Sequence, residues 1–99
     1  MHTVLEYDED GNIIGRGYLY IIHNSLHDEP YGLIEDIWVD KSFRKKGIGK
    51  KIVNKLIKKA ISRKCYKIIA TSRFERENVH KFYEDIGFKK WGYEFRYDI

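Results

Sequence analysis

Two runs of β-branched and aromatic residues stand at the start of the chain, separated by a polar turn. β-branched and aromatic residues are frequent in residues 2–7 and 13–22, and the polar segment between them contains the pair Asp10-Gly11. An Asp-Gly pair readily takes up positive φ and is typical of the tight turn between two antiparallel strands. The pattern therefore predicts a β-hairpin.

A third strand is predicted for residues 33–39, where β-branched and aromatic residues again dominate. This run carries two adjacent carboxylates, Glu35 and Asp36. Because successive side chains of a strand point to opposite faces, we expect Glu35 on the same face as Ile37 and Val39, and Asp36 on the other. At least one carboxylate is then placed to line a cleft.

A helix is predicted for residues 47–62. The apolar positions in this segment recur at steps of three and four, which places them along one side of a helix: Ile48, Ile52, Val53, Leu56, Ile57, Ala60 and Ile61. The lysines of the segment fall mainly on the other side, so most of the positive charge is expected to face water.

The rest of the chain predicts one more helix and three short strands. Residues 66–72 form an apolar run typical of a buried strand, and a second helix is bounded by Asn78 in front and Gly87 behind. Residues 88–90 and 93–97 are predicted as two further strands. The predicted order is strand, strand, strand, helix, strand, helix, strand, strand, which describes an α/β domain with a mixed sheet.

The composition sets limits on the kind of protein. Of the 99 residues, 42% are hydrophobic, which is enough for one core and predicts that residues 1–99 form a single domain. No apolar run approaches the roughly 18 residues of a membrane span, and the first residues lack the pattern of a signal peptide. We therefore expect a cytoplasmic protein without a membrane partner. Cys65 is the single cysteine and the histidines lack zinc-site spacing, so we expect no disulfide within the chain and no metal.

Charge is distributed unevenly along the chain. Residues 1–40 contain nine acidic side chains and one basic side chain, whereas residues 41–67 contain twelve basic side chains and no acidic one. This pattern indicates an anion bound near residues 41–50, with carboxylates upstream of it. A helix with a solvated lysine face would explain the same charges.

The segment from Asp40 to Lys50 joins the third strand to the first helix. The first N–H groups of a helix have no partners within it and carry the positive end of the helix dipole, so a phosphate is stabilised there. Two glycines, Gly47 and Gly49, allow the backbone to approach a ligand closely. Four basic side chains add positive charge at the same place: Arg44, Lys45, Lys46 and Lys50. Together these features predict a pyrophosphate site.

Two segments resemble the signatures of a known family. The run Arg44-Lys45-Lys46-Gly47-Ile48-Gly49 is similar to the R/Q-x-x-G-x-G/A signature of the GNAT superfamily of N-acetyltransferases. As in that family, it follows a strand that ends with Val39-Asp40 and it opens a long amphipathic helix. Downstream, Asn78, Phe82-Tyr83-Glu84 and Gly87-Phe88 resemble the second signature in order and spacing. The runs Ile34-Glu35-Asp36-Ile37 and Cys65-Tyr66-Lys67-Ile68 also resemble the glucosamine-phosphate N-acetyltransferase branch.

The resemblance implies a site for acetyl-coenzyme A and an amine acceptor. Residues 44–50 would hold the pyrophosphate through backbone amides, and the backbone of Ile37, Trp38 and Val39 would pair with the pantetheine arm as a strand does. Tyr83 matches the tyrosine that faces the leaving sulfur. Glu35 stands where related enzymes place a general base, with Asp36 as second choice, and a water can relay the proton to either. Asn78 would cap the second helix, reach the coenzyme arm, or do both.

The sequence also departs from the family pattern. The usual domain begins with another strand and one or two helices that build much of the acceptor site, and residues 1–99 contain no counterpart. We expect an open acceptor cleft, a macromolecular acceptor, or a partner subunit, with a homodimer favoured. A small-molecule amine is the preferred acceptor, and a protein lysine or N-terminus is the alternative. A non-catalytic coenzyme A-binding module and a nucleic-acid-binding module are the alternatives outside enzymes, and we expect no nucleic-acid partner.

Overall fold

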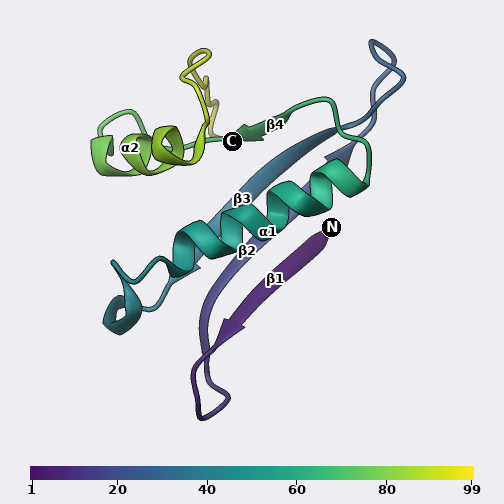
Figure 1. The fold of residues 1–99 in the computed structure, drawn as a ribbon. Coiled ribbons are helices and arrows are strands. Elements are labelled where there is room, and N and C mark those ends of the chain that lie inside the picture. The colour runs from purple at the N-terminus through teal and green to yellow at the C-terminus, as the bar shows by residue number, and fades with distance from the viewer.

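The computed structural model describes residues 1–99, which form a four-stranded sheet with two helices (Figure 1). The strands are β1 (His2–Tyr7), β2 (Ile13–Ile22), β3 (Tyr31–Val39) and β4 (Ile68–Ala70), and they lie in this order across the sheet. The pairs β1–β2 and β2–β3 are antiparallel, and β3–β4 is parallel. The fold is therefore the mixed α/β arrangement that the sequence predicts.

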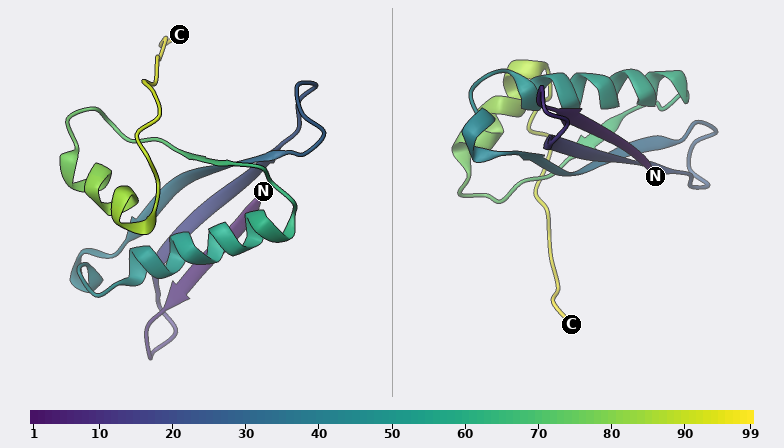
Figure 2. Two further views of the ribbon diagram at one scale, coloured as in Figure 1. Left: turned by 45° about the horizontal axis from the view of Figure 1, so that its top comes forward. Right: turned by 90° about the horizontal axis from the view of Figure 1, so that it is seen from below.

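The helices lie beside and beyond this sheet. A short 3-10 helix, η1 (Lys41–Phe43), leads into α1 (Ile48–Ser62), which crosses one face of the sheet (Figures 1 and 2). After β4 the chain forms α2 (Glu77–Ile86), which contacts α1 and packs Phe82, Tyr83 and Ile86 against the edge of the core. Neither helix combines the length and the apolar character that crossing a membrane requires.

The predicted hairpin between β1 and β2 is confirmed. One carboxylate oxygen of Asp8 accepts hydrogen bonds from the backbone N–H groups of Asp10 (2.9 Å) and Asn12 (2.8 Å). Gly11 has φ +84°, a left-handed conformation that favours glycine. The turn is thus fixed by an Asp side chain at its start and by a glycine at its tip.

The core lies between α1 and the sheet. Its fully or almost fully buried side chains come from β2, β3 and α1: Leu19, Ile34, Ile52, Val53, Leu56 and Ala60. A Cβ atom at Gly17 would lie 2.6 Å from Cδ1 of Ile37 and 2.8 Å from Cγ2 of Ile52, so glycine is needed for α1 to lie this close to β2. The predicted apolar side of the helix is confirmed except at Ile61, which is exposed.

The third strand is not regular, which corrects the predicted orientation of Glu35. Ile34 and Ile37 both pack on the core side although they are three residues apart, and the register with β2 shifts between Arg16 and Tyr18. Asp36 has φ +54° and marks a bulge at this point. Glu35 therefore does not share a face with Ile37, because the bulge inserts one residue into the alternation.

The end of the chain differs from the prediction in two ways. The residues predicted as strands, 88–90 and 93–97, form none, and β4 covers only Ile68–Ala70 of the predicted 66–72. A strand needs a neighbouring strand for its backbone hydrogen bonds, and the end of the chain lies next to none. The α2 helix begins at Glu77 with Arg76 as its N-cap residue, so Asn78 lies inside the first turn and does not cap it. The predicted end at Gly87 is confirmed.

Candidate active site

A cleft of about 350 Å³ opens between β3, the end of β4 and α2. Ten residues line it: Ile34, Glu35, Asp36, Ile37, Thr71, Ser72, Arg76, Val79, Phe82 and Tyr83. Three predicted catalytic residues, Glu35, Asp36 and Tyr83, are therefore brought together from segments almost fifty positions apart. The cleft combines an apolar lining with a few polar groups, which is typical of a small-molecule site.

The cleft exists because β3 is much longer than β4. The parallel pairing joins only Gly32, Leu33 and Ile34 to β4. From Glu35 onward β3 continues to Val39 with no strand on that side. This free edge presents backbone N–H and C=O groups to an extended ligand, which could add to the sheet as a strand does. Residues 37–39, predicted to pair with a pantetheine arm, lie in this free part of β3.

The start of α1 lies at the end of the same strand and has unpaired backbone amides. The first hydrogen bond of the helix runs from the N–H of Lys51 to the carbonyl of Gly47 (3.0 Å), and no side chain caps the helix. The backbone N–H groups of residues 45–50 therefore donate to no acceptor in the chain. Gly47 has φ +80°, and no heavy atom lies within 4 Å of the place where its Cβ would stand. These amides and this open space fit a diphosphate group.

The second glycine of the loop, Gly49, has a packing role that the sequence did not predict. A Cβ atom at Gly49 would lie 3.3 Å from Cε1 of Phe82 and 3.7 Å from Cγ2 of Val39. Gly49 thus allows α1 to approach α2, and the ring of Phe82 lies between the loop of residues 44–50 and the cleft. Ile48, which stands between the two glycines in sequence, packs against the core.

The basic side chains of the loop form no ion pairs. The Nε of Arg44 donates to the carbonyl of Val39 (3.1 Å), and the Nζ of Lys46 lies 5.3 Å from the centre of the Phe43 ring. Lys45 and Lys50 are exposed, and Lys45 has φ +62°. Because no carboxylate neutralises these four cations, their charge is available to an anion at the loop.

Tyr83 lies in the wall of the cleft against two other aromatic rings. Its ring makes edge contacts with Phe82 and Phe88, with ring centres 5.2 Å and 5.3 Å away. Burial raises the pKa of the Tyr83 phenol above its ordinary value. The phenol is therefore protonated at neutral pH and can donate a hydrogen bond into the cleft.

The two carboxylates are exposed at the opposite wall of the cleft. Asp36 has φ +54°, a conformation that costs a non-glycine residue free energy and that often marks functional sites. The next residues return to regular alternation: Ile37 faces the core, and Trp38 faces away with the Arg16 guanidinium 5.1 Å from its ring centre. Only the backbone of Trp38, and not its side chain, is placed for a ligand at the β3 edge.

Sequence reasoning missed some of the cleft residues. Thr71 and Ser72 follow β4 directly, and Arg76 stands at the start of α2. A polar pair at the end of an apolar strand is a signal that could have pointed to them, whereas nothing in the pattern marks Arg76. Asn78, predicted to contact the coenzyme, is exposed and does not line the cleft.

Known proteins share this sequence and architecture. The model of the acetyltransferase (GNAT) family matches residues 1–88. A glucosamine 6-phosphate N-acetyltransferase from Trypanosoma brucei brucei is 38% identical over 90 residues, which is 90% of this chain and 59% of that protein. An N-alpha-acetyltransferase 30 from Dictyostelium discoideum is 35% identical over 66 residues, which is 67% of this chain and 36% of that protein.

A solved structure agrees with these matches. The crystal structure of an acetyltransferase from Trypanosoma brucei superposes with a TM-score of 0.90 at 32% identity, over 98% of this chain and 68% of that one. The chain spans about three fifths of the glucosamine 6-phosphate N-acetyltransferase that it matches. The match over residues 1–88 and the shared fold show that the chain belongs to the acetyltransferase (GNAT) family.

Proposed function

We propose that the chain transfers the acetyl group of acetyl-coenzyme A to the primary amine of a small molecule, with glucosamine 6-phosphate as the leading acceptor. The observation that carries this proposal is the row of unpaired amides at residues 45–50, which lies at the end of the free β3 edge that forms the cleft wall. A diphosphate at the amides would direct an extended arm along Ile37–Val39 toward Tyr83.

In the proposed reaction the amine nitrogen attacks the thioester carbonyl, the new C–N bond forms and the C–S bond breaks. The amine must be neutral to attack, so its proton passes to Glu35 or Asp36, directly or through a water. Tyr83 donates a hydrogen bond to the sulfur as negative charge develops there. A phenol is a weaker acid than a thiol by about 1.5 pKa units in water, and burial weakens it further. Tyr83 therefore stabilises the thiolate without giving up its proton in the transition state.

The charges in the cleft suit an acceptor that carries both an amine and an anion. Arg76 lines the cleft together with Thr71 and Ser72, and it forms no ion pair. A guanidinium binds a phosphate well because its donors match two oxygens at once. Arg76 is thus a candidate for the acceptor phosphate, with Glu35 and Asp36 at the amine end. The relative that is named as a glucosamine 6-phosphate N-acetyltransferase supports an acceptor of this type.

The test is an acceptor screen that follows release of the coenzyme A thiol. We expect turnover with glucosamine 6-phosphate, and a KM for glucosamine at least tenfold higher, because one charge-assisted contact contributes about 1.5 kcal/mol or more. Arg76→Gln should raise the KM for glucosamine 6-phosphate to that of glucosamine, while Arg73→Gln, in the same segment but outside the cleft lining, should not. Absence of thiol release with every amine would contradict the proposal.

A second variant pair tests the coenzyme site alone. Gly47 and Gly11 both have positive φ, +80° and +84°, and both have open space at the Cβ position. Gly47→Val and Gly11→Val therefore introduce similar backbone strain at two different places. We expect Gly47→Val to weaken acetyl-coenzyme A binding by about tenfold or more in calorimetry, and Gly11→Val to leave it unchanged. Equal affinities in the two variants would show that the coenzyme does not bind at the loop.

Transfer to the N-terminus of a protein is the second candidate. The observation that favours it is the relative named N-alpha-acetyltransferase 30, which is 35% identical over two thirds of this chain. The screen therefore includes short peptides with free and with blocked N-termini. Turnover of the free peptides above that of all amino sugars would identify this second activity.

A further inference from the structure

The segment that joins β4 to α2, residues 71–76, carries three polar residues of the cleft. Thr71, Ser72 and Arg76 all line the cleft. The segment belongs to no helix or strand, and Figure 2 shows it arching away from the sheet before α2 begins. The positions of these three side chains therefore depend on what holds this β4–α2 segment in place.

Few interactions hold the β4–α2 segment. Three of its side chains are charged, yet none of them forms an ion pair. Its backbone makes no hydrogen bond to the sheet, and the hydrogen bonds that it makes are within the segment and with the first residues of α2. The start of α2 is therefore the part of the chain that fixes the segment.

His80 on α2 holds both ends of the turn at residues 73–76. Its backbone N–H donates to the carbonyl of Arg76 (3.2 Å), and its ring Nε2 lies 2.9 Å from the carbonyl oxygen of Arg73. Because a carbonyl oxygen only accepts, the ring donates through Nε2–H. The N–H of Arg76 donates to the same carbonyl of Arg73 (3.1 Å). These three hydrogen bonds connect Arg73, Arg76 and His80 with one another.

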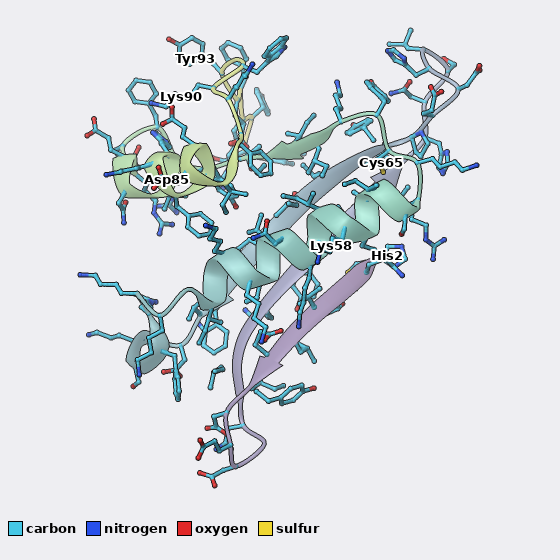
Figure 3. All side chains as sticks on the ribbon, viewed as in Figure 1. His2, Lys58, Cys65, Asp85, Lys90 and Tyr93 are labelled. Carbon is cyan, nitrogen blue, oxygen red and sulfur yellow. The ribbon has the colours of Figure 1, made fainter.

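The ring of His80 takes the place of a cap that α2 lacks. A polar N-cap side chain commonly fixes the first turn of a helix by accepting from its N–H groups, but the N-cap residue Arg76 makes no such bond. Packing contributes little, since α2 buries no side chain and Figure 3 shows its Asp85 well apart from Lys58 on α1. The bond from His80 to Arg73 is the only side-chain hydrogen bond between α2 and the β4–α2 segment.

We infer that His80 is a positioning residue: it holds the turn that places Arg76 at the cleft, and it thereby sets how tightly an acceptor phosphate binds. His80 does not line the cleft, so it acts through Arg76. An arginine that is already held in place loses less freedom when it binds, which favours binding. The statement about the acceptor rests on the proposed function, whereas the hold on the turn does not.

Kinetics with the whole chain test the action on the acceptor. His80→Ala removes the ring but not the helix, because alanine favours a helix more than histidine does. We expect the KM for glucosamine 6-phosphate to rise about threefold to tenfold, the factor for one hydrogen bond, with kcat and the KM for acetyl-coenzyme A within about twofold of the wild type. His80→Gln should restore most of the loss, because its amide donates from a similar position. Lys81→Ala, at the exposed next position, is the matched control and should leave every constant unchanged.

A double-mutant cycle shows whether His80 acts through Arg76. In the Arg76→Gln background the guanidinium is absent, so adding His80→Ala should raise the KM for glucosamine 6-phosphate by less than about twofold. A further rise as large as that in the wild-type background would overturn the inference. So would a loss in His80→Gln as large as the loss in His80→Ala.

Hydrogen exchange tests the hold on the turn without any acceptor. The N–H of Arg76 donates to the same carbonyl that His80 binds, so opening of the turn exposes it to water. Its exchange rate, measured by NMR on the whole chain, should rise about threefold to tenfold in His80→Ala and stay unchanged in His80→Gln and Lys81→Ala. If no amino sugar is acetylated but these rates change as expected, the proposed acceptor is wrong and the hold on the turn stands. Equal exchange of Arg76 in His80→Ala and the wild type would contradict the inference whatever the acceptor.

Discussion

Residues 1–60 and residues 61–99 contribute very differently to the core. All twelve buried residues of the chain lie between Glu6 and Ala60, and none follows. Helix α1 buries four of its side chains, Ile52, Val53, Leu56 and Ala60, whereas α2 buries none. Since burial of apolar side chains is the main source of stability, the first region should remain folded under conditions in which α2 opens.

The candidate active site lies at the boundary between these regions. Glu35, Asp36 and Ile37 belong to the well-packed part, whereas Arg76 and Tyr83 stand on the lightly packed part. The geometry of the cleft therefore depends on how firmly α2 is held. A ligand that contacts both sides would hold α2 in place. The scaffold and the site can therefore be perturbed separately.

The largest effect is expected in the core of the first region. Leu56 is fully buried, so Leu56→Ala should lower the free energy of unfolding by about 2–5 kcal/mol. Ile86 in α2 is only partly buried, so Ile86→Ala should lower the free energy of unfolding by about 1 kcal/mol. Urea denaturation followed by circular dichroism measures both values. Equal losses would mean that α2 belongs to the same cooperative core as α1.

Ligand binding should reduce the difference between the two regions. With coenzyme A at about 100 times its dissociation constant, openings that destroy the proposed site become less favourable by about 2.7 kcal/mol. The amide hydrogens of α2 should then exchange about 100-fold more slowly in hydrogen-exchange mass spectrometry. The hairpin turn at residues 8–12 serves as control, because its local opening does not touch the cleft. Unchanged exchange in α2 would argue against a ligand that spans both sides.

Replacing Tyr83 with phenylalanine tests the proposed hydrogen bond to the sulfur and keeps the aromatic packing. Tyr83→Phe keeps the ring contacts with Phe82 and Phe88 but removes the hydroxyl, so kcat should fall about 10- to 100-fold, or about 1.4–2.7 kcal/mol, with little change in stability. Tyr20→Phe, outside the cleft, is the control. Because burial raises the pKa of Tyr83 above the ordinary phenol value of about 10, the donor form predominates well below that pH, and no loss of kcat from this group is expected between pH 7 and 9. A falling kcat in that range that Tyr83→Phe abolishes would contradict this role.

Most of the scaffold could be predicted from the sequence because it follows from local patterns. The hairpin strands and the third strand appear as runs of β-branched and aromatic residues, and α1 appears as a helical stripe. Glu35, Asp36 and Tyr83 were predicted as site residues, and they line one cleft. The bulge at Asp36 was not predicted. In a regular strand, two residues on the same face are separated by an even number of positions, whereas Ile34 and Ile37 are three apart. The spacing of these two apolar residues was the available signal.

The C-terminal part could not be predicted in the same way because its structure depends on distant partners. Residues 88–90 and 93–97 were predicted as strands from their composition, and this prediction is wrong, because the end of the chain has no neighbouring strand to pair with. In the same way, Arg76 enters the cleft only because α2 is placed opposite β3, which no local pattern encodes. A sequence pattern predicts which side of a helix or strand is apolar. It does not predict which other part of the protein packs against that side.

The smallest effect concerns a carboxylate in the well-packed region. Glu6 is 8% exposed and accepts from the Nζ of Lys51 (2.9 Å) and of Lys55 (2.6 Å), both on α1. Burial alone would raise the pKa of Glu6, but the two hydrogen-bonded lysines outweigh it and hold the pKa below its usual value. The ionised carboxylate therefore stabilises the fold above its unfolded pKa of about 4.3, and this contribution is lost as the pH falls through the lower folded value. Glu6→Gln should cost about 1 kcal/mol at pH 7, because both lysines can still reach water, and the difference from the wild type should shrink below about pH 4. Urea denaturation across this pH range measures the free energy of unfolding of both proteins, and Glu9→Gln in the exposed turn is the control. If the difference in unfolding free energy between Glu6→Gln and the wild type stayed constant down to pH 2, the side chain would stabilise the fold through its shape and not through its charge.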